Sequence, residues 1–230
     1  MQKQKINLLY LVMQNTYEDI ETAIFNDITL LEKESIDKIS ASKTLVPKID
    51  LLLKKHHFSL EDLTFLGVNK GPGPFTTLRV VITTANALNF AADIPLVGID
   101  GLDAIAQEYK DIVWPITVIL LNAYNNDVYY AIQYNDNIEK GWKNIEELLK
   151  QLKLQFPDDK VRFIGNAANL FSSLIKEVFG NFEYIQEPTP QTSSIEQIAK
   201  MALENWKNKQ GIVEQILPVY LKDAVKIKIN

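Results

Sequence analysis

Apolar residues recur along the chain with strand and helix periods, in two similar series. In the first series, three strand-like segments joined by polar turns are followed by a helix, a strand, a helix and another strand. The first of these helices has the spacing i, i+4, i+7, i+8, which places Leu45, Ile49, Leu52 and Leu53 on one face. The expected strands are 5–13, 20–26, 30–37, 64–69 and 95–100, and the expected helices are 43–56 and 76–92.

The second series follows a short expected helix at 101–110 and repeats much of this order. Gly180 is expected to end one of its helices, and the stretch 188–192, Pro-Thr-Pro-Gln-Thr, resembles a linker. After it, Ser193 and Glu196 form a capping box for a last helix. The expected strands are 112–123, 128–135, 138–142 and 161–165, and the expected helices are 144–154, 167–179 and 193–209.

This order predicts a mixed α/β protein with two related halves. Three strands, a helix, a strand and a helix, found twice, is the order that a duplicated ribonuclease-H-like unit would have. The predicted domains are therefore an N-terminal lobe at 1–100 and a C-terminal lobe at 101–230.

Composition narrows the function classes only modestly. A formal net charge of −5 gives the chain no general attraction for nucleic-acid phosphates. The sequence has no cysteine, which excludes disulfides, thiolate metal sites and cysteine nucleophiles. The apolar run at 8–13 is too short for a signal-peptide core or a membrane span, so a cytoplasmic protein without membrane contact is expected.

The sharpest local feature is the stretch 71–79, Gly-Pro-Gly-Pro-Phe-Thr-Thr-Leu-Arg, between an apolar run and a helical segment. Glycine permits φ > 0 or close backbone approach, and proline fixes φ and removes a donor, so a tight corner is expected. Thr76 is a plausible cap of the following helix. Such a corner can be purely structural, can hold an anion or can dock a partner. The loop-motif residues are Gly71, Pro72, Gly73, Phe75 and Thr76.

The motif Gly-Pro-Gly-x-Phe-Thr-x-Leu-Arg closely resembles the signature of the bacterial TsaB (YeaZ) family of the actin-like ATPase superfamily. Segments 41–49, 95–99, 121–131 and 217–222 resemble further parts of the family in the same order, so the resemblance covers nearly the whole chain.

The chain also departs from the family pattern within the loop motif and the hairpin. Pro74 and Thr77 stand where the family usually has Ser and Gly. Asn122 and Tyr124 replace the Asp and Arg of its Asp-Ala-Arg-x-x-Glu-Val-Tyr hairpin. These changes leave fewer charged or phosphate-compatible groups.

The resemblance implies an α/β protein with a duplicated ribonuclease-H-like (actin-like ATPase superfamily) fold of two mixed-sheet lobes. It further implies a non-catalytic scaffold subunit of the complex that forms threonylcarbamoyladenosine in tRNA. Such a subunit dimerises with the catalytic TsaD subunit and meets a TsaE-type ATPase through the complex. A homodimer is expected when TsaD is absent, tRNA is contacted only indirectly, and no cofactor or metal is expected.

The two helices at 43–56 and 76–92 are the expected pairing surface. The second is apolar on more than one face, so either the chain's own sheet and helices cover it or another subunit does. In the family, the matching helices pair TsaB with TsaD or with itself. The expected partner-binding residues are Leu45, Ile49, Leu52, Leu53, Phe75, Leu78, Arg79 and Ile82.

The alternative function is a divergent actin-like ATPase or small-molecule kinase that uses the Gly71–Thr77 loop. Such enzymes need a carboxylate near the end of the first strand to hold Mg²⁺ or orient water. This chain has Gln14-Asn15-Thr16 there, where the family usually has Asp-Thr-Ser, so independent ATP hydrolysis is not expected.

Two other groups of residues are candidate sites. His56 and His57 are adjacent, which does not give the i,i+4 spacing of a two-histidine metal face. The tyrosines of the hairpin at 121–135 could form a base-stacking platform, but strand propensity alone also accounts for them and no basic residues interleave.

Overall fold

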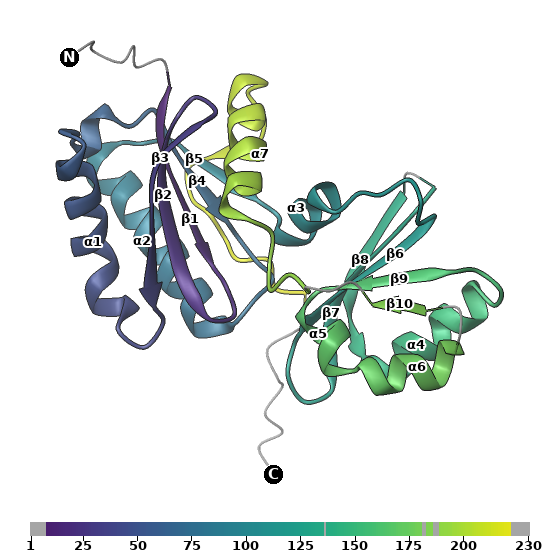
Figure 1. Cartoon of the computed structure of the whole chain (residues 1–230). Helices are drawn as coiled ribbons and strands as arrows, with labels where there is room; N and C mark the ends of the chain where they lie inside the picture. Colours follow the sequence, from purple (N-terminus) through teal and green to yellow (C-terminus); the bar gives the residue numbers. More distant parts are fainter. Residues whose placement is uncertain (1–7, 136, 181–182, 186–188, 222–230) are drawn as a thin grey trace. The chain divides into compact units, whose positions relative to one another are not determined.

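The computed structural model describes residues 8–135, 137–180, 183–185 and 189–221. They form two compact units (Figure 1). Unit 1 contains the chain up to Ala104 together with Ser193–Val219, and unit 2 contains Ile105–Thr192 and the chain from Tyr220. The expected division at residue 100 is close to the first boundary. The expected C-terminal lobe is corrected, because Ser193–Val219 returns to unit 1 after the segment predicted as a linker.

Unit 1 is built on a six-stranded sheet in the order β11-β5-β4-β1-β2-β3. Strands β1 to β3 form an antiparallel meander, and β4 and β5 run parallel to β1. All residues of β1 and β4 are buried, as expected for central strands covered on both faces. The strands are β1 Leu9–Asn15, β2 Asp19–Asn26, β3 Thr29–Asp37, β4 Phe65–Asn69, β5 Leu96–Ile99 and β11 Ile212–Val213.

Helices cover both faces of this sheet (Figure 1). On one face lie α1 Ala41–Lys55 and α2 Phe75–Ala92, which share a core with alternate residues of the strands. On the other face lies α7 Ile195–Lys207, whose Ala199, Ala202 and Leu203 pack with Tyr10 and Phe65. The remaining elements of this part of the chain are the 3-10 turn Leu60–Asp62 and α3 Gly101–Glu108.

Unit 2 repeats the plan with a five-stranded sheet in the order β10-β9-β6-β7-β8. Helices α4 and α6 pack with one face of it, around Leu148, Leu149, Ile175 and Phe179. The strands are β6 Ile116–Asn122, β7 Asp127–Tyr134, β8 Asn137–Asn144, β9 Val161–Ile164 and β10 Glu183–Ile185, and the helices are α4 Ile145–Gln155, α5 Asn166–Leu170 and α6 Ser172–Phe179.

Five strands of the first sheet, all but β11, match the five strands of the second. In each, the first three strands of the unit form an antiparallel meander, and the next two strands add in parallel on the other side of its first strand. This repetition confirms the predicted duplicated ribonuclease-H-like α/β fold. Among the described residues, no helix is long and apolar enough to cross a membrane.

Several element predictions are corrected in detail. The predicted helix at 167–179 is broken at Phe171 into α5 and α6, although Gly180 ends it as expected. The last helix is capped by Ser194, whose hydroxyl accepts the Gln197 N–H at 3.1 Å, and not by Ser193. Neither of the short strands β10 and β11 was predicted. Residues 5–7 of the first predicted strand lie outside the described residues.

Candidate functional site

The loop at 71–77 is a tightly packed corner between β4 and α2. The Gly71 N–H donates to Asn69 Oδ1 at 2.9 Å, and the Gly71 carbonyl accepts the Gly101 N–H at 2.8 Å. Gly71 has φ +95°, and a Cβ there would lie 2.8 Å from a methyl carbon of buried Leu78. The α2 helix begins at Phe75 with Pro74 in the cap position, so the expected Thr76 cap is corrected. The glycine at 71 therefore serves close packing.

The end of β1 beside this loop carries two buried amides, Gln14 and Asn15, and Gln14 binds other groups of the chain. Gln14 Nε2 donates to Glu21 Oε2 at 2.7 Å and to the Ser193 carbonyl at 3.2 Å. Its Oε1 accepts from Asn69 Nδ2 at 3.3 Å. Asn15 is also buried, with its Nδ2 against Gly73, where a Cβ would approach to 2.9 Å. These hydrogen bonds connect the loop to the segment that leads into α7.

The side chains at the end of β1 differ from the carboxylate that an actin-like Mg²⁺–nucleotide site uses there. Mg²⁺ is usually held by one or two carboxylates and phosphates, whereas Gln14 and Asn15 are neutral amides. The carboxylate that contacts Gln14, Glu21, also pairs with Lys33 at 2.8 Å. Within the described ranges there is no group of three or more His, Asp or Glu side chains that could hold a metal ion. His56 instead contacts Glu32 on β3 at 2.7 Å.

Six of the eight expected partner-binding residues do not lie on the surface. Their side chains are only 1–5% exposed and fill the core between the helices and the sheet. The expectation that they face a partner is therefore corrected for this conformation. The cause is that the apolar face found by helical spacing is the face that covers the chain's own sheet. The six are Leu45, Ile49, Leu52, Leu53, Leu78 and Ile82.

The other two, Phe75 and Arg79, lie on an exposed stripe along α2. The Arg79 guanidinium carbon stacks 3.9 Å from the Phe75 ring centroid. The stripe continues through Thr83, Ala87 and Phe90, which recur every three or four residues and so share one face of the helix. A shallow hollow of about 520 Å³ lies along its first half, lined by Ser42, Phe75, Thr76, Arg79, Val80, Thr83 and Thr84.

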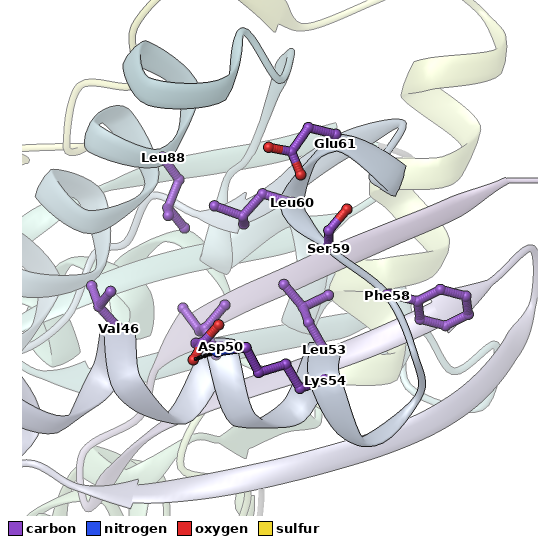
Figure 2. Close-up of a pocket in the computed structure, with 10 residues that line it drawn as sticks. Val46, Asp50, Leu53, Lys54, Phe58, Ser59, Leu60, Glu61 and Leu88 are labelled. Carbon is purple, nitrogen blue, oxygen red and sulfur yellow. Dashed lines mark hydrogen bonds and ion pairs between the residues drawn. The ribbon is translucent and has the colours of Figure 1, made fainter.

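A second hollow opens between α1 and α2, near the other end of the helices (Figure 2). It has a volume of about 250 Å³, and its apolar walls include Val46, Leu53, Leu60 and Leu88. Figure 2 shows Leu53 on α1 pointing toward Leu60, with Leu88 on the neighbouring helix. At its rim, Lys54 pairs with Asp50 at 2.7 Å. We call this hollow the helix cleft.

Apart from Phe75, the partner-binding residues expected from the sequence did not include the exposed apolar residues of these two helices. Val46 is 52% exposed and Leu51 is 61% exposed on α1, and Phe90 is almost fully exposed on α2. The signal was present, because an apolar residue off the main apolar stripe of an amphipathic helix is expected to face outward. The exposed face of α2 thus carries mostly apolar and small side chains, and α1 adds Val46 and Leu51 among exposed lysines. We call this surface the paired-helix face; it contains Val46, Leu51, Phe75, Arg79, Thr83, Ala87 and Phe90.

The matching pair of sheets defines the class of this protein as a duplicated ribonuclease-H-like fold of the actin-like type. A family model described as "TsaD: tRNA N6-adenosine threonylcarbamoyltransferase" matches residues 37–226, and the chain belongs to this family.

Individual relatives agree with this membership. The chain is 25% identical over 213 residues to the tRNA threonylcarbamoyladenosine biosynthesis protein TsaB of Bacillus subtilis, covering 89% of this chain and 86% of the relative. It is 24% identical over 194 residues to the protein of the same name from Buchnera aphidicola, covering 78% and 82% of the two chains. YeaZ from Pseudomonas aeruginosa has the same fold, with a TM-score of 0.71, 19% identity and coverage of 94% of this chain and all of that one. The resemblance to the TsaB (YeaZ) family is therefore confirmed.

Proposed function

We propose that this chain is a non-catalytic scaffold subunit of the machinery that forms threonylcarbamoyladenosine in tRNA. In this function it dimerises with a TsaD-type catalytic subunit and supports it. The pathway is supported by the names of the TsaB relatives. The scaffold role rests on one observation, the paired-helix face, which exposes apolar and small side chains on two adjacent helices.

The shape of the paired-helix face suits a helical partner. Thr83 and Ala87 are small and lie one turn apart on α2, so a second helix could approach closely there. Phe75 and Phe90 flank them along the same stripe and supply large apolar area. The face is thus expected to receive two helices of the partner, in a four-helix arrangement.

The helix cleft adds a place for an anchoring side chain. Its apolar walls and volume of about 250 Å³ suit one aliphatic or aromatic side chain from the partner. Binding energy in protein interfaces concentrates in a few such buried anchors. In the absence of the partner, a second copy of the chain would use the same face to form a homodimer. A TsaE-type ATPase would meet the chain only within the complex.

The non-catalytic part of the proposal is supported by the amide corner, by which we mean Gln14, Asn15 and Asn69 at the ends of β1 and β4. Gln14 is hydrogen-bonded to three groups of the chain itself and cannot supply the anionic ligand of an actin-like ATPase. The alternative is an ATPase or small-molecule kinase that uses the Gly71–Thr77 loop. Mg²⁺-dependent ATP binding by the isolated chain would revive it.

The test is size-exclusion chromatography with light scattering on this chain and the TsaD-type subunit of the same organism, alone and mixed. The expected result is a 1:1 complex for the unchanged chain. Thr83→Arg places a long cation at the site of closest approach, and Val46→Asp places a charge beside the helix cleft. Both positions are exposed, so both variants should fold and lose the complex.

Leu154→Asp is the matched control, since Leu154 is 85% exposed on α4 of unit 2 and lies outside the paired-helix face. This variant should pair normally. A complex that survives both Thr83→Arg and Val46→Asp, with circular dichroism unchanged, would refute the proposed interface.

A further inference from the structure

The turn between β6 and β7 holds an aromatic side chain in a costly backbone conformation. Tyr124, Asn125 and Asn126 have φ values of 59°, 55° and 61°. Asparagine tolerates this left-handed region, whereas a tyrosine there is uncommon. The turn is well defined by hydrogen bonds, with Asp127 N–H donating to the Tyr124 carbonyl at 3.0 Å. The Tyr124 ring is nevertheless 55% exposed, so the chain accepts backbone strain for a side chain that stabilises little.

Two further aromatic rings lie on the adjoining strands. Tyr129 on β7 is the register partner of Trp142 on β8, and cross-strand partners project from the same face of a sheet. Trp142 is 40% exposed and Tyr129 is half-buried. The neighbouring Tyr130 projects to the opposite face and belongs to the core of unit 2.

Tyr124 lies in the turn that joins β6 to β7, five residues before Tyr129. Burial is the main reason that the pKa of Tyr129 is raised, and the phenol of Tyr124 and the carboxylate of Asp127 raise it further. The hairpin therefore presents three rings from two strands and a turn. We call Tyr124, Tyr129 and Trp142 the aromatic triad.

The polar groups around the aromatic triad suit a neutral planar ligand better than a phosphate. Asp127 and Lys140 lie on the same face as Tyr129 and Trp142 by strand alternation, and their charges balance. Phosphate backbones are usually bound by several cations, which this face does not gather. The side chains of Asn125 and Asn126 are exposed beside the rings and carry the amide groups that pair with base edges.

We propose that the aromatic triad stacks an unpaired nucleobase, with Asn125 or Asn126 hydrogen-bonding its edge. The base could belong to a single-stranded loop of RNA or to a free nucleotide. Naming tRNA as the natural RNA source rests on the proposed function, whereas the stacking itself does not. A direct base contact also departs from the expectation that this chain meets tRNA only through its partner.

Trp142 fluorescence reports the contact directly. The chain has three tryptophans, so the measurement uses a Trp114→Phe/Trp206→Phe background that leaves Trp142 as the single indole. Phenylalanine keeps a ring where Trp114 stacks on Tyr184 and where Trp206 stacks on Phe65. The probes are single-stranded oligoadenylate, the same strand annealed to oligouridylate, and AMP.

The expected result is saturable quenching by oligoadenylate with a shallow salt dependence, and little quenching by the duplex, whose bases are already stacked. Stronger quenching by oligoadenylate than by AMP at equal base concentration identifies RNA as the source, and the reverse identifies a free nucleotide. Equal quenching by duplex and single strand, or no quenching by oligoadenylate and AMP, overturns the proposal. Quenching by the TsaD-type subunit alone, with none by oligoadenylate or AMP, also overturns it.

Tyr124→Asn separates binding from folding. Asparagine suits the left-handed turn, so this variant should have an unchanged or higher melting temperature while its affinity for oligoadenylate falls about tenfold. Tyr124→Phe keeps the ring and should bind normally. Unchanged affinity in Tyr124→Asn contradicts the proposal. Because Tyr124 lies outside the paired-helix face, this variant should still form the 1:1 complex, so failure of stacking and failure of pairing are observed separately.

Discussion

Gly71 of the glycine–proline loop allows a sharp test of how unit 1 is packed. Its φ of +95° is unfavourable for any other residue, and a Cβ at this position would lie 2.8 Å from buried Leu78. Gly211 provides a matched control in the same unit. It has φ +64°, but its Cβ would meet only atoms at 3.5 Å or beyond. Gly71→Ala therefore adds backbone strain and a steric overlap, whereas Gly211→Ala adds strain alone.

The expected costs follow from these two contributions. A non-glycine residue with positive φ costs about 1–2 kcal/mol. Overpacking a filled core by one methyl group costs about 1–3 kcal/mol more. Gly71→Ala should therefore lower the free energy of unfolding of unit 1 by about 2–5 kcal/mol, and Gly211→Ala by about 1–2 kcal/mol. The larger value is a considerable part of the stability of an ordinary domain.

Urea unfolding followed by Trp206 fluorescence measures these costs in the right unit, because Trp206 stacks on Phe65 of β4 at 5.0 Å. The background carries Trp114→Phe and Trp142→Phe, so that unit 2 contributes no signal. With a slope of about 2 kcal/mol per M, Gly71→Ala should lower the midpoint by roughly 1–2.5 M urea.

Leu78→Ala provides the internal check. In that variant the overlapping methyl groups are absent, so adding Gly71→Ala should cost about 1–3 kcal/mol less than it does in the unchanged chain. Equal midpoint shifts for Gly71→Ala and Gly211→Ala, with no coupling to Leu78, would refute the claim that close packing requires glycine here.

Three further predictions use residues of known burial. Leu52 is buried, so Leu52→Ala should lower the free energy of unfolding by about 2–5 kcal/mol. Its neighbour Leu51 is exposed, so Leu51→Ala should change the free energy of unfolding by less than about 0.5 kcal/mol, and urea titration measures both values. Burial, with a smaller contribution from Asp27, raises the pKa of Tyr10. The protonated phenol therefore stabilises the fold fully below the unfolded pKa of about 10, and this stabilisation is lost as the pH rises toward the folded pKa. In unfolding curves measured at alkaline pH, Tyr10→Phe should show a smaller loss of stability with rising pH. Arg162→Ala should lower the stability of unit 2 by about 2–4 kcal/mol in thermal unfolding, because it removes a buried guanidinium that binds Thr117, Asp111 and the Tyr109 carbonyl.

Much of the fold could be predicted from the sequence because its longer elements have a clear period. The buried strands β1 and β4 and the amphipathic helices α1, α2 and α4 each bury a regular set of apolar residues. Strands β10 and β11 contain three and two residues, too few to show a period. The place of α7 was also not predictable, because its apolar face could have covered either unit.

The candidate site could be predicted only in part, for a different physical reason. Helical spacing identified Leu45, Ile49, Leu52 and Leu53 as one face of α1, and that face is real. The spacing of apolar residues shows which face of a helix is buried, but not whether the chain itself or a partner covers that face. The chain's own sheet covers this one, and the surface open to a partner carries residues off the stripe, such as Val46. The resemblance to the TsaB family indicated which helices to consider, but not which side of them.

Hydrogen bonds within the amide corner link the glycine–proline loop to the segment before α7. Asn69 binds the Gly71 N–H with its oxygen and Gln14 with its nitrogen, and Gln14 in turn binds the Ser193 carbonyl just before α7. These groups are buried, so leaving any of them unpaired would cost about 1–3 kcal/mol. The network therefore fixes the loop from which α2 begins, with Phe75 and Arg79 on its exposed first turn. In this interpretation, the polar residues at the end of β1 hold the paired-helix face in position rather than binding a nucleotide.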